Sequence, residues 1–304
     1  MDSVSAATFS SYAIKTAVAD AMKQAGLEAP TVSMKNAEKP ATERAAEECD
    51  IVIVGGGPAG LAAAISAKQT NADKNVILVE KLDILSGNGK FDMNFFDMIN
   101  TEAQKAAGND EWVGEAGLAK FIEEKSANGE SAERIQVWAN EEYGIDAWLR
   151  AMGVELNYNY GGTNHMAEDN QYSGEVIQAG LEKAAAELGV DVRTGTKGMD
   201  LVMEDGVCKG VVVTNNANET YTINAKSTII ATGGFCSNKE LLAEYAPGYE
   251  VFNTSNQMGT TGDFVKVFEQ NGFKMENMGK MSFFSNIIVP VSYTHLTLPT
   301  IYSV

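Results

Sequence analysis

An apolar run followed by three closely spaced glycines constrains the fold of this chain more than any other stretch. Residues 50–54 are mostly β-branched, which is typical of a strand buried in a parallel sheet. Gly55, Gly57 and Gly60 follow with the spacing Gly-x-Gly-x-x-Gly, and residues 61–68 have the composition of a helix that begins directly after them. In dinucleotide-binding folds these glycines permit a tight turn, let a pyrophosphate approach the backbone and let the helix pack on the strand. The amino end of the helix then offers unpaired N–H groups to the phosphates.

An acidic residue at the expected distance supports the same interpretation. Residues 75–79 form a second apolar run that ends at Glu80, 20 residues after Gly60. A carboxylate there can accept hydrogen bonds from both hydroxyls of an adenosine ribose. Two alternatives stay open: the glycines serve packing alone, or Glu80 is a solvated acid at the end of a strand. The candidate cofactor contacts of this region are Gly55, Gly57, Pro58, Ala59, Gly60, Glu80 and Lys81.

Length and composition limit the class of protein. With 304 residues, 44% of them hydrophobic and 21% charged, the chain can bury a full core and has the composition of a soluble globular protein. We find no signal-peptide pattern and no apolar run near the ~20 residues that a transmembrane segment needs. The net charge of −18 disfavours nucleic acid or anionic lipid as a partner. Three scattered cysteines and two histidines predict neither a metal site nor a haem attachment site.

The first 48 residues differ from the rest. Ser10 and Ser11 can cap a helix over residues 12–25, which Gly26 would end. Residues 27–48 carry two prolines, many charges and no periodicity, so we interpret them as a linker.

The middle of the chain mixes helices and short strands. The helix expected over residues 131–153 is amphipathic, and we expect its aromatic residues, Trp138 among them, in the core. His165 ends a glycine-rich segment, 161–165, that we interpret as a loop. We expect a structural or solvated role for the histidine, and the alternative is a role beside a substrate. Further helices are expected over residues 115–125 and 175–188, and short strands, separated by turns, over 190–193, 198–204 and 207–214.

Three further small-residue segments can approach a cofactor. Residues 227–231 read as a buried strand with a sharp glycine turn after it, residues 256–263 form a glycine-rich loop before a helix at 264–271, and residues 86–90 are a loop of small residues. A single nicotinamide-binding fold does not need the first two. The alternatives are a surface loop at 86–90 and an ordinary helix-capping acid at Asp263. These segments add Gly87, Asn88, Ala231, Thr232, Gly233, Gly234, Gly262 and Asp263 to the candidate contacts.

Taken in order, these motifs resemble one family over roughly residues 49–285: the FAD-dependent fumarate reductases, which include flavocytochrome c flavoprotein subunits and urocanate reductases. The resemblance implies an α/β fold: an FAD-binding, Rossmann-like domain of the two-dinucleotide-binding flavoprotein type, with a parallel central sheet, a small β-meander and a truncated capping domain. It implies FAD at the candidate contacts above, with Glu80 on the adenosine ribose. It also implies hydride transfer from flavin N5 to the C=C bond of a fumarate-like unsaturated carboxylate, and a redox electron donor as partner.

The amino-terminal segment resembles the end of FMN-binding domains that carry FMN on the threonine of a Ser-Gly-Ala-Thr motif. The matching residues are 5–8, so Thr8 would be the acceptor in the full-length protein, although Ala6 replaces the glycine of the motif. Residues 1–26 would then be the remnant of such a domain. Members of this type are commonly extracytoplasmic, which implies an extracytoplasmic or membrane-associated location.

The sequence also departs from the family. Residues 90–96 replace a loop that usually holds more glycines, and Phe283 and Phe284 stand where a substrate-binding histidine is expected. The proton-donating arginine has no counterpart, so we assign no catalytic residue. Residues 291–304 resemble translated sequencing-adapter sequence, so His295 receives no role. We therefore expect a fragment truncated at both ends, with an incomplete FAD-binding domain over 49–290, a non-native tail and no turnover by itself.

Two other functions remain open at this point. One is a different flavoenzyme on the same scaffold, such as a ketosteroid dehydrogenase or an aspartate oxidase, because these differ in the capping domain. The Thr8 motif favours the fumarate reductase interpretation over these flavoenzymes. The other is a non-catalytic dinucleotide-binding module or an NAD dehydrogenase; the segments 231–235 and 259–263, which a single nicotinamide-binding fold does not need, stand against NAD.

Overall fold

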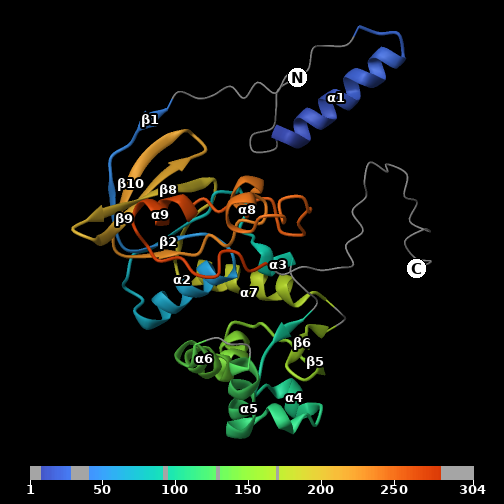
Figure 1. Ribbon diagram of the computed structural model, residues 1–304, viewed down its shortest axis with the longest axis vertical. Coiled ribbons are helices and arrows are strands. Elements are labelled where there is room, and N and C mark those ends of the chain that lie inside the picture. The colour runs from blue at the N-terminus through green and yellow to red at the C-terminus, as the bar shows by residue number, and fades with distance from the viewer. Residues whose placement is uncertain (1–7, 29–40, 92–94, 128–130, 169–170, 282–304) are drawn as a thin grey trace. The chain divides into compact units, whose positions relative to one another are not determined.

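The computed structural model describes residues 8–28, 41–91, 95–127, 131–168 and 171–281 (Figure 1). The chain divides into two compact units, residues 1–233 and residues 234–304, which are described separately below. The first helix of the chain, α1 (Thr8–Gln24), begins four residues earlier than expected. The side chain of Thr8 and the tail 291–304 lie outside the described part.

The first unit is built on a seven-stranded sheet with the order β7-β3-β2-β10-β9-β8, to which β1 adds beside β10. Strands β2, β3, β7 and β10 run parallel to their neighbours in this group, whereas β9 is antiparallel to both β8 and β10. In register, Ile223 of β10 lies beside Glu47 and Ile230 beside Val54. The strand bounds are β1 Thr42–Glu43, β2 Glu47–Val54, β3 Val76–Val79, β7 Asp191–Arg193, β8 Thr196–Glu204, β9 Val207–Asn215 and β10 Glu219–Ile230.

The expected meander differs from the observed one in its members. Strand β7 does not pair with β8; it lies at the far edge of the sheet, parallel to β3. The meander is β8, β9 and the first part of β10, whose last part pairs with β2. The expected linker 27–48 is also too long at its end, because β1 and the start of β2 are hydrogen-bonded to β10.

Two helices pack beside the parallel strands. Helix α2 (Pro58–Thr70) connects β2 to β3, and α7 (Ser173–Glu187) precedes β7. Figure 1 shows them side by side beneath the sheet. Ile53, Leu61, Ile65, Leu78 and Leu181 belong to one core cluster and are nearly inaccessible to solvent. Their burial is the main favourable contribution to folding of this layer.

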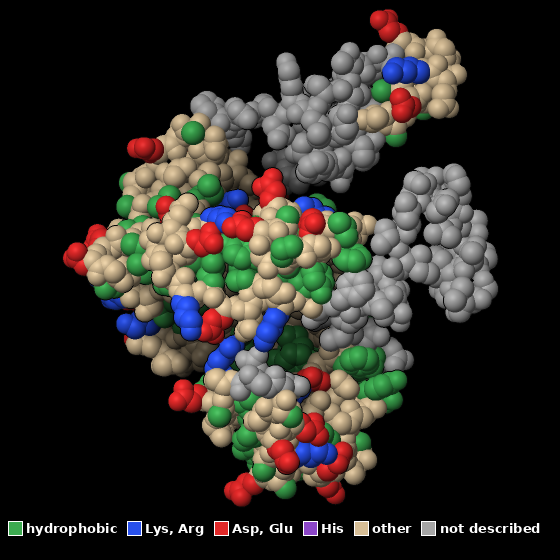
Figure 2. All heavy atoms as spheres, viewed as in Figure 1, with side chains coloured by type: hydrophobic (Ala, Val, Ile, Leu, Met, Phe, Trp, Pro, Cys, Tyr) green, Lys and Arg blue, Asp and Glu red, His purple; other side chains and the backbone are tan. Residues whose placement is uncertain are grey.

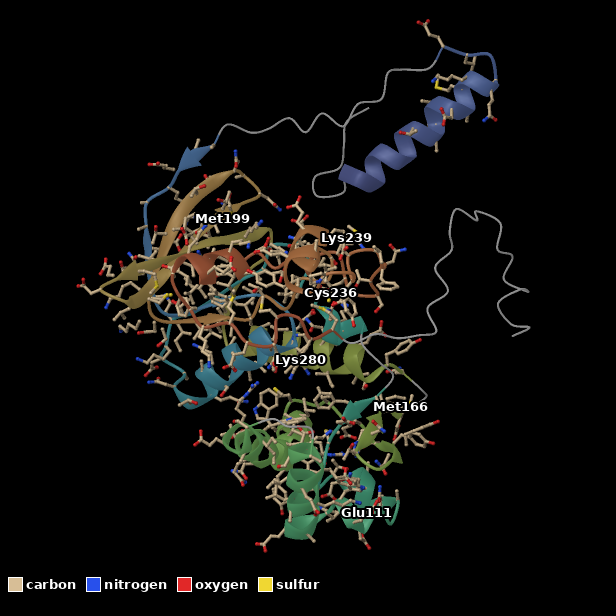
Figure 3. All side chains as sticks on the ribbon, in the orientation of Figure 1. Glu111, Met166, Met199, Cys236, Lys239 and Lys280 are labelled. Carbon is tan, nitrogen blue, oxygen red and sulfur yellow. The ribbon has the colours of Figure 1, made fainter. Side chains whose placement is uncertain are left out.

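The chain between β3 and α7 forms mostly helices and a small second sheet of order β4-β6-β5. Segment 161–165 is therefore not a loop: it spans the turn of a β-hairpin, and His165 lies on β6, the strand that ends at Met166, which Figure 3 labels. Trp138 is 45% exposed, so the expectation that it is a core residue is wrong. The elements here are α3 Asn88–Phe91, β4 Phe96–Asp97, α4 Glu102–Ala106, η1 Asp110–Trp112, α5 Gly114–Ser126, α6 Ala132–Ala151, β5 Tyr158–Gly161 and β6 Asn164–Met166.

Over residues 234–281, the part of the second unit that the structure describes, there are two short helices, α8 (Lys239–Tyr245) and α9 (Val265–Gln270). Helix α9 confirms the helix expected after residue 263, whereas α8 was not expected from sequence. The side chain of Asn238 caps α8 by accepting hydrogen bonds from two backbone N–H groups of its first turn. Phe235, Leu241, Leu242 and Ala246 form the core of this unit.

Charged groups of both signs are interspersed on the face drawn in Figure 2 rather than gathered in one patch. None of the helices in the described ranges is long and apolar enough to span a lipid bilayer.

Candidate cofactor site

The glycine turns of the first unit lie at one edge of its sheet. Residues 55–57, Glu80 and residues 231–233 directly follow β2, β3 and β10, which are neighbours and parallel. Because the carboxyl ends of parallel strands meet at one edge, these segments come together. Strand β2 is also the point where the strand order reverses, with β3 and β7 on one side and β10 on the other. Ligands of open α/β sheets bind in the crevice at such a point.

Gly55 joins the first glycine turn to the second. Its backbone has φ of +117°, and a Cβ at this position would lie 2.3 Å from the carbonyl oxygen of Ala231. The N–H of Gly55 donates to Val79 at 2.8 Å, and the N–H of Ala231 donates to Val54 at 2.8 Å. The ends of three strands are thus tied together around a residue that has to be glycine.

A second close approach brings the glycine turn against the loop after β3. Gly87 has φ of +133°, and a Cβ there would lie 3.0 Å from the Cα of Gly57. A Cβ on Gly57 would in turn meet the carbonyl oxygen of Ser86 at 3.2 Å. Two backbones without side chains therefore pack directly against each other, which holds the loop after β3 against the glycine turn. The loop expected at 86–90 is in part a helical turn, because α3 begins at Asn88.

The start of α2 is suited to an anion. Its cap residue is Gly57, which offers no side-chain acceptor, and Pro58 occupies the first turn. At this end of the helix the N–H of Leu61 donates to the carbonyl oxygen of Gly57 at 3.0 Å. The N–H groups of Ala59 and Gly60 precede it and have no acceptor within the helix. Ala59 is exposed, whereas Gly60 is buried, so the N–H of Ala59 and the positive end of the helix dipole are available to a phosphate.

Glu80 is buried and hydrogen-bonded, so the alternative of a solvated acid is wrong. It is only 8% exposed. Its Oε2 accepts from the N–H of Gly56 at 2.7 Å, and its Oε1 accepts from the N–H of Leu82 at 2.8 Å. Each carboxylate oxygen has a further lone pair, so Glu80 can still accept from two hydroxyl groups. Sequence reasoning missed Gly56, whose only signal is that it lies between two motif glycines.

Gly262 has a packing role within the second unit. A Cβ there would lie 2.6 Å from Cβ of Phe235, and φ is +67°. Its N–H donates to the oxygen of Gly234 at 3.1 Å, which joins the turn at 234 to the loop before α9. Asp263 accepts a hydrogen bond from the hydroxyl of Thr261 at 3.1 Å. The convergence of this segment on the turns of the first unit stays a prediction.

His165 has a structural environment. It is fully buried, with Nδ1 2.8 Å from the carbonyl oxygen of Thr163 and Nε2 2.6 Å from Oγ1 of Thr101. Nδ1 faces an acceptor and so carries the proton, which leaves Nε2 to accept from the threonine hydroxyl. Burial lowers the pKa of His165 and keeps the ring neutral. The alternative of a role beside a substrate is not supported by this environment.

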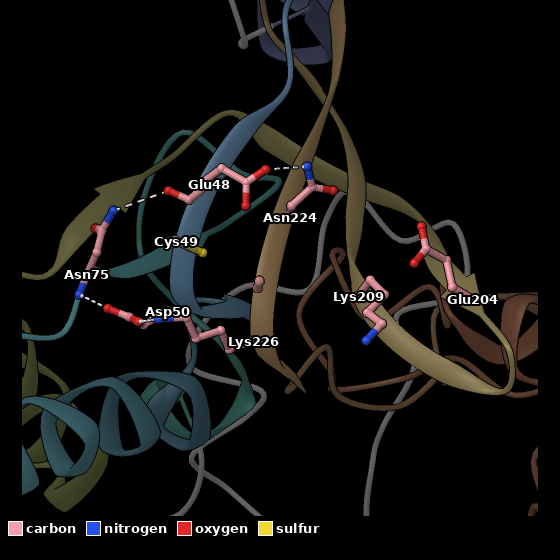
Figure 4. Close-up of a pocket in the computed structure, with 9 residues that line it drawn as sticks. Glu48, Cys49, Asp50, Asn75, Glu204, Lys209, Asn224 and Lys226 are labelled. Atoms are coloured by element: carbon pink, nitrogen blue, oxygen red, sulfur yellow. Dashed lines mark hydrogen bonds and ion pairs between the residues drawn. The ribbon is translucent and has the colours of Figure 1, made fainter.

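A pocket of about 630 Å³ lies away from these turns, near the amino end of β3 (Figure 4). Lys226 Nζ is 2.6 Å from Asp50 there, and this bond, with the N–H of Asn75, lowers the pKa of Asp50 to about 2. Burial raises the pKa of the Cys49 thiol to about 11, so this cysteine is a poor nucleophile. The described residues contain no group of His, Cys, Asp and Glu suited to hold a metal ion.

The carboxyl edge, in contrast, fits a flavin dinucleotide: backbone without side chains at Gly57 and Gly87, uncapped N–H donors at the start of α2, and a buried carboxylate 24 residues from Gly56. The profile of a family described as FAD binding domain matches residues 50–296. The chain belongs to this FAD-binding family. The family expected from sequence, the α/β fold and FAD as cofactor are thereby confirmed.

Relatives of known activity include a fumarate oxidoreductase and a urocanate reductase. The FAD-binding chain is 29% identical over 303 residues to an NADH:fumarate oxidoreductase of Klebsiella pneumoniae, covering 96% of this chain and 31% of the relative. It is 32% identical over 294 residues to a urocanate reductase of Eggerthella lenta, covering 91% and 47%. The chain therefore spans less than half of the length of each of these relatives.

Solved structures share its fold. The open conformation of a flavocytochrome c3 fumarate reductase superposes with a TM-score of 0.68 at 31% identity, over 74% of this chain and 41% of that one. A 3-ketosteroid-Δ4-(5α)-dehydrogenase from Rhodococcus jostii RHA1 also has a TM-score of 0.68, over 81% and 58%, but at 19% identity, which shows the fold alone.

Proposed function

We propose that this chain is the FAD-binding part of a reductase that saturates the C=C bond of a fumarate-like unsaturated carboxylate. The observation that carries the proposal is the Gly55–Ala231 contact, which brings two glycine turns together at the strand-order reversal, beside buried Glu80. The relatives named fumarate reductase and urocanate reductase support the substrate class. The ketosteroid dehydrogenase shares only the fold, so we do not favour that alternative.

The residue roles follow from the chemistry of each group. The uncapped N–H groups of Ala59 and Gly60, with Gly55, Gly57 and Pro58, would hold the pyrophosphate. Glu80 would accept from the ribose hydroxyls, with Lys81 next to it. The residues proposed to line the rest of the cofactor are Gly87, Asn88, Ala231, Thr232, Gly233, Gly234, Gly262 and Asp263.

FAD, when bound, supplies the hydride for reduction of an activated double bond. The protein side of this step is orientation: the backbone at Gly57 and Gly87 limits where the cofactor can lie, and the buried Glu80 fixes its adenosine end. The electron donor and the anchors of the substrate carboxylates belong to the proposal for the whole protein. We further propose Thr8 as an FMN attachment site there, which mass spectrometry of the amino-terminal peptide would test.

The deciding experiment combines a spectrum with an assay of the whole protein. We expect the chain to bind FAD and show flavin absorbance bands, and the whole protein to oxidise reduced viologen when fumarate or urocanate is added. A colourless protein after incubation with FAD would contradict the cofactor site. A yellow protein that reduces neither acid but oxidises a ketosteroid with an artificial acceptor would contradict the substrate class and leave the cofactor site intact.

A further inference from the structure

A fully buried glutamine lies beneath the first glycine turn. Gln178 is on α7, the helix that packs beside α2, and its side chain is inaccessible to solvent. Its neighbours on the buried face of the helix, Ile177, Leu181 and Ala185, are all apolar. Burying an amide in such a layer is unfavourable unless the amide makes hydrogen bonds. Its position therefore needs a reason beyond packing.

The hydrogen bonds of this amide supply the reason. Nε2 of Gln178 donates to Oε1 of Glu182 at 2.9 Å and, at the long end of the range, to the carbonyl oxygen of Gly56 at 3.4 Å. Both partners are acceptors, so the amide nitrogen and not the oxygen has to face them. Oε1 of Gln178 is buried without a hydrogen-bond partner among the described residues. The side chain thus keeps an unsatisfied acceptor in order to hold its donor toward Gly56.

Gly56 is consequently held through both of the peptide groups that flank its Cα. Its carbonyl faces Gln178, and its N–H donates to Oε2 of Glu80 at 2.7 Å. Two sets of hydrogen bonds therefore meet at Gly56: its carbonyl accepts from Gln178, which is also bonded to Glu182, and its N–H donates to the carboxylate of Glu80. The orientation of that carboxylate is therefore coupled to α7.

We propose that Gln178 is a positioning residue of the FAD site. It fixes the position of Gly56, whose N–H holds Oε2 of Glu80, and so leaves the remaining lone pairs of Glu80 for the ribose hydroxyls. Gln178 does not itself touch the cofactor. This inference rests on the proposed function, in which Glu80 binds the adenosine ribose.

The test is Gln178→Met, which keeps the length of the side chain and removes the amide. The FAD dissociation constant, measured by titrating the apoprotein, should rise roughly five-fold, the effect of losing one orienting hydrogen bond. The same substitution in a Glu80→Gln background should change FAD affinity by less than about two-fold, because the group that Gln178 orients has already been altered. Additive effects in this double-mutant cycle would overturn the inference.

Gln104 offers a matched control. It is also a fully buried glutamine whose Nε2 donates to backbone carbonyls, at 3.1 Å to Met98 and 3.0 Å to Gly162, but it lies on α4. Gln104→Met should lower the melting temperature while leaving FAD affinity unchanged. Equal loss of FAD affinity in both variants would show a general effect of stability and overturn the positioning role.

Glu182→Met keeps the inference testable if Gln178→Met does not fold. Glu182 is only half-buried, and its loss frees the amide of Gln178 from its shorter bond. FAD affinity should fall roughly two-fold. If neither Gln178→Met nor Glu182→Met changed FAD affinity in a folded protein, the positioning role would be refuted. Failure of the unaltered chain to bind FAD would instead refute the proposed cofactor site, so the two failures are distinguishable.

Discussion

The carbonyl oxygen of Gly55 lies 1.9 Å from the position that a Cβ on Gly60 would occupy. Neither residue can move away from the other: the N–H of Gly55 is hydrogen-bonded to Val79 of β3, and Gly60 lies in the first turn of α2. The turn therefore closes on itself so tightly that the third glycine is required for space and not for an unusual φ. This relationship leads to the first prediction.

Gly60→Ala should destabilise the fold by about 1–3 kcal/mol or more, because the added methyl group overlaps a backbone atom that cannot move aside. Urea unfolding measures the loss. Gly144→Ala is the control: Gly144 lies inside α6 with nothing within 4 Å of its Cβ position. That substitution should raise the free energy of unfolding by about 0.5–1 kcal/mol, because alanine has a higher helix propensity than glycine. Equal effects of both substitutions would contradict the close packing at Gly60.

Glu80→Gln should weaken FAD binding roughly ten-fold, because hydrogen bonds from hydroxyls to a charged carboxylate are worth more than those to an amide oxygen. The amide also presents an N–H group to the backbone donors at Gly56 or Leu82, both of which need an acceptor. FAD titration measures the change. Glu187→Gln, on an exposed acid at the end of α7, serves as the control. An unchanged dissociation constant for Glu80→Gln would remove Glu80 from the site.

Unfolding of the protein should depend on pH through Glu142. Burial, and then repulsion by Asp97, raises the pKa of this carboxyl from 4.5 to about 7, and its Oε1 has no hydrogen-bond partner among the described residues. The folded state therefore holds a proton that the unfolded state releases above pH 4.5. Stability falls as pH rises from about 4.5 through 7, by roughly 3 kcal/mol in total.

Glu142→Gln should remove this loss and make the protein more stable than the unaltered one at pH 8, with little difference at pH 4.5. Urea unfolding at the two pH values provides the comparison. Identical pH dependence of the two proteins would show that Glu142 is charged and accommodated in the folded state.

Thr101→Val should cost about 2–3 kcal/mol, because Oγ1 of Thr101 caps α4 at the N–H of Gln104 and also lies 2.6 Å from Nε2 of His165. Thr101→Ser retains the hydroxyl and should recover most of the loss. Thermal unfolding distinguishes the two variants. If Thr101→Val changed FAD affinity and left stability intact, the structural role of His165 would be wrong.

Much of the fold could be predicted from the local order of residues along the chain. The β-branched run before Gly55, the glycine spacing and the acid at Glu80 predict strand, turn, helix and strand in the order observed. These features can be predicted from the sequence because they depend on residues close together in the chain. Side-chain branching favours the strand, backbone freedom permits the turn, and capping sets the start of the helix. The positions of His165 and β7 could not be predicted in this way. A hairpin turn has the same composition as a loop, and the sequence of a short strand does not show which edge of the sheet the strand joins.

The sequence by itself determined the dinucleotide-binding turn, because only glycine tolerates the backbone of Gly55 and the space at Gly60. Only the tertiary structure decided that the carbonyl of Ala231 lies against Gly55, that Glu80 is buried on the N–H of Gly56, and that Gln178 supports the same residue from α7. Each of these pairs is separated by many residues along the chain. Their contact depends on which strands become neighbours, a property of the whole sheet that no local pattern encodes.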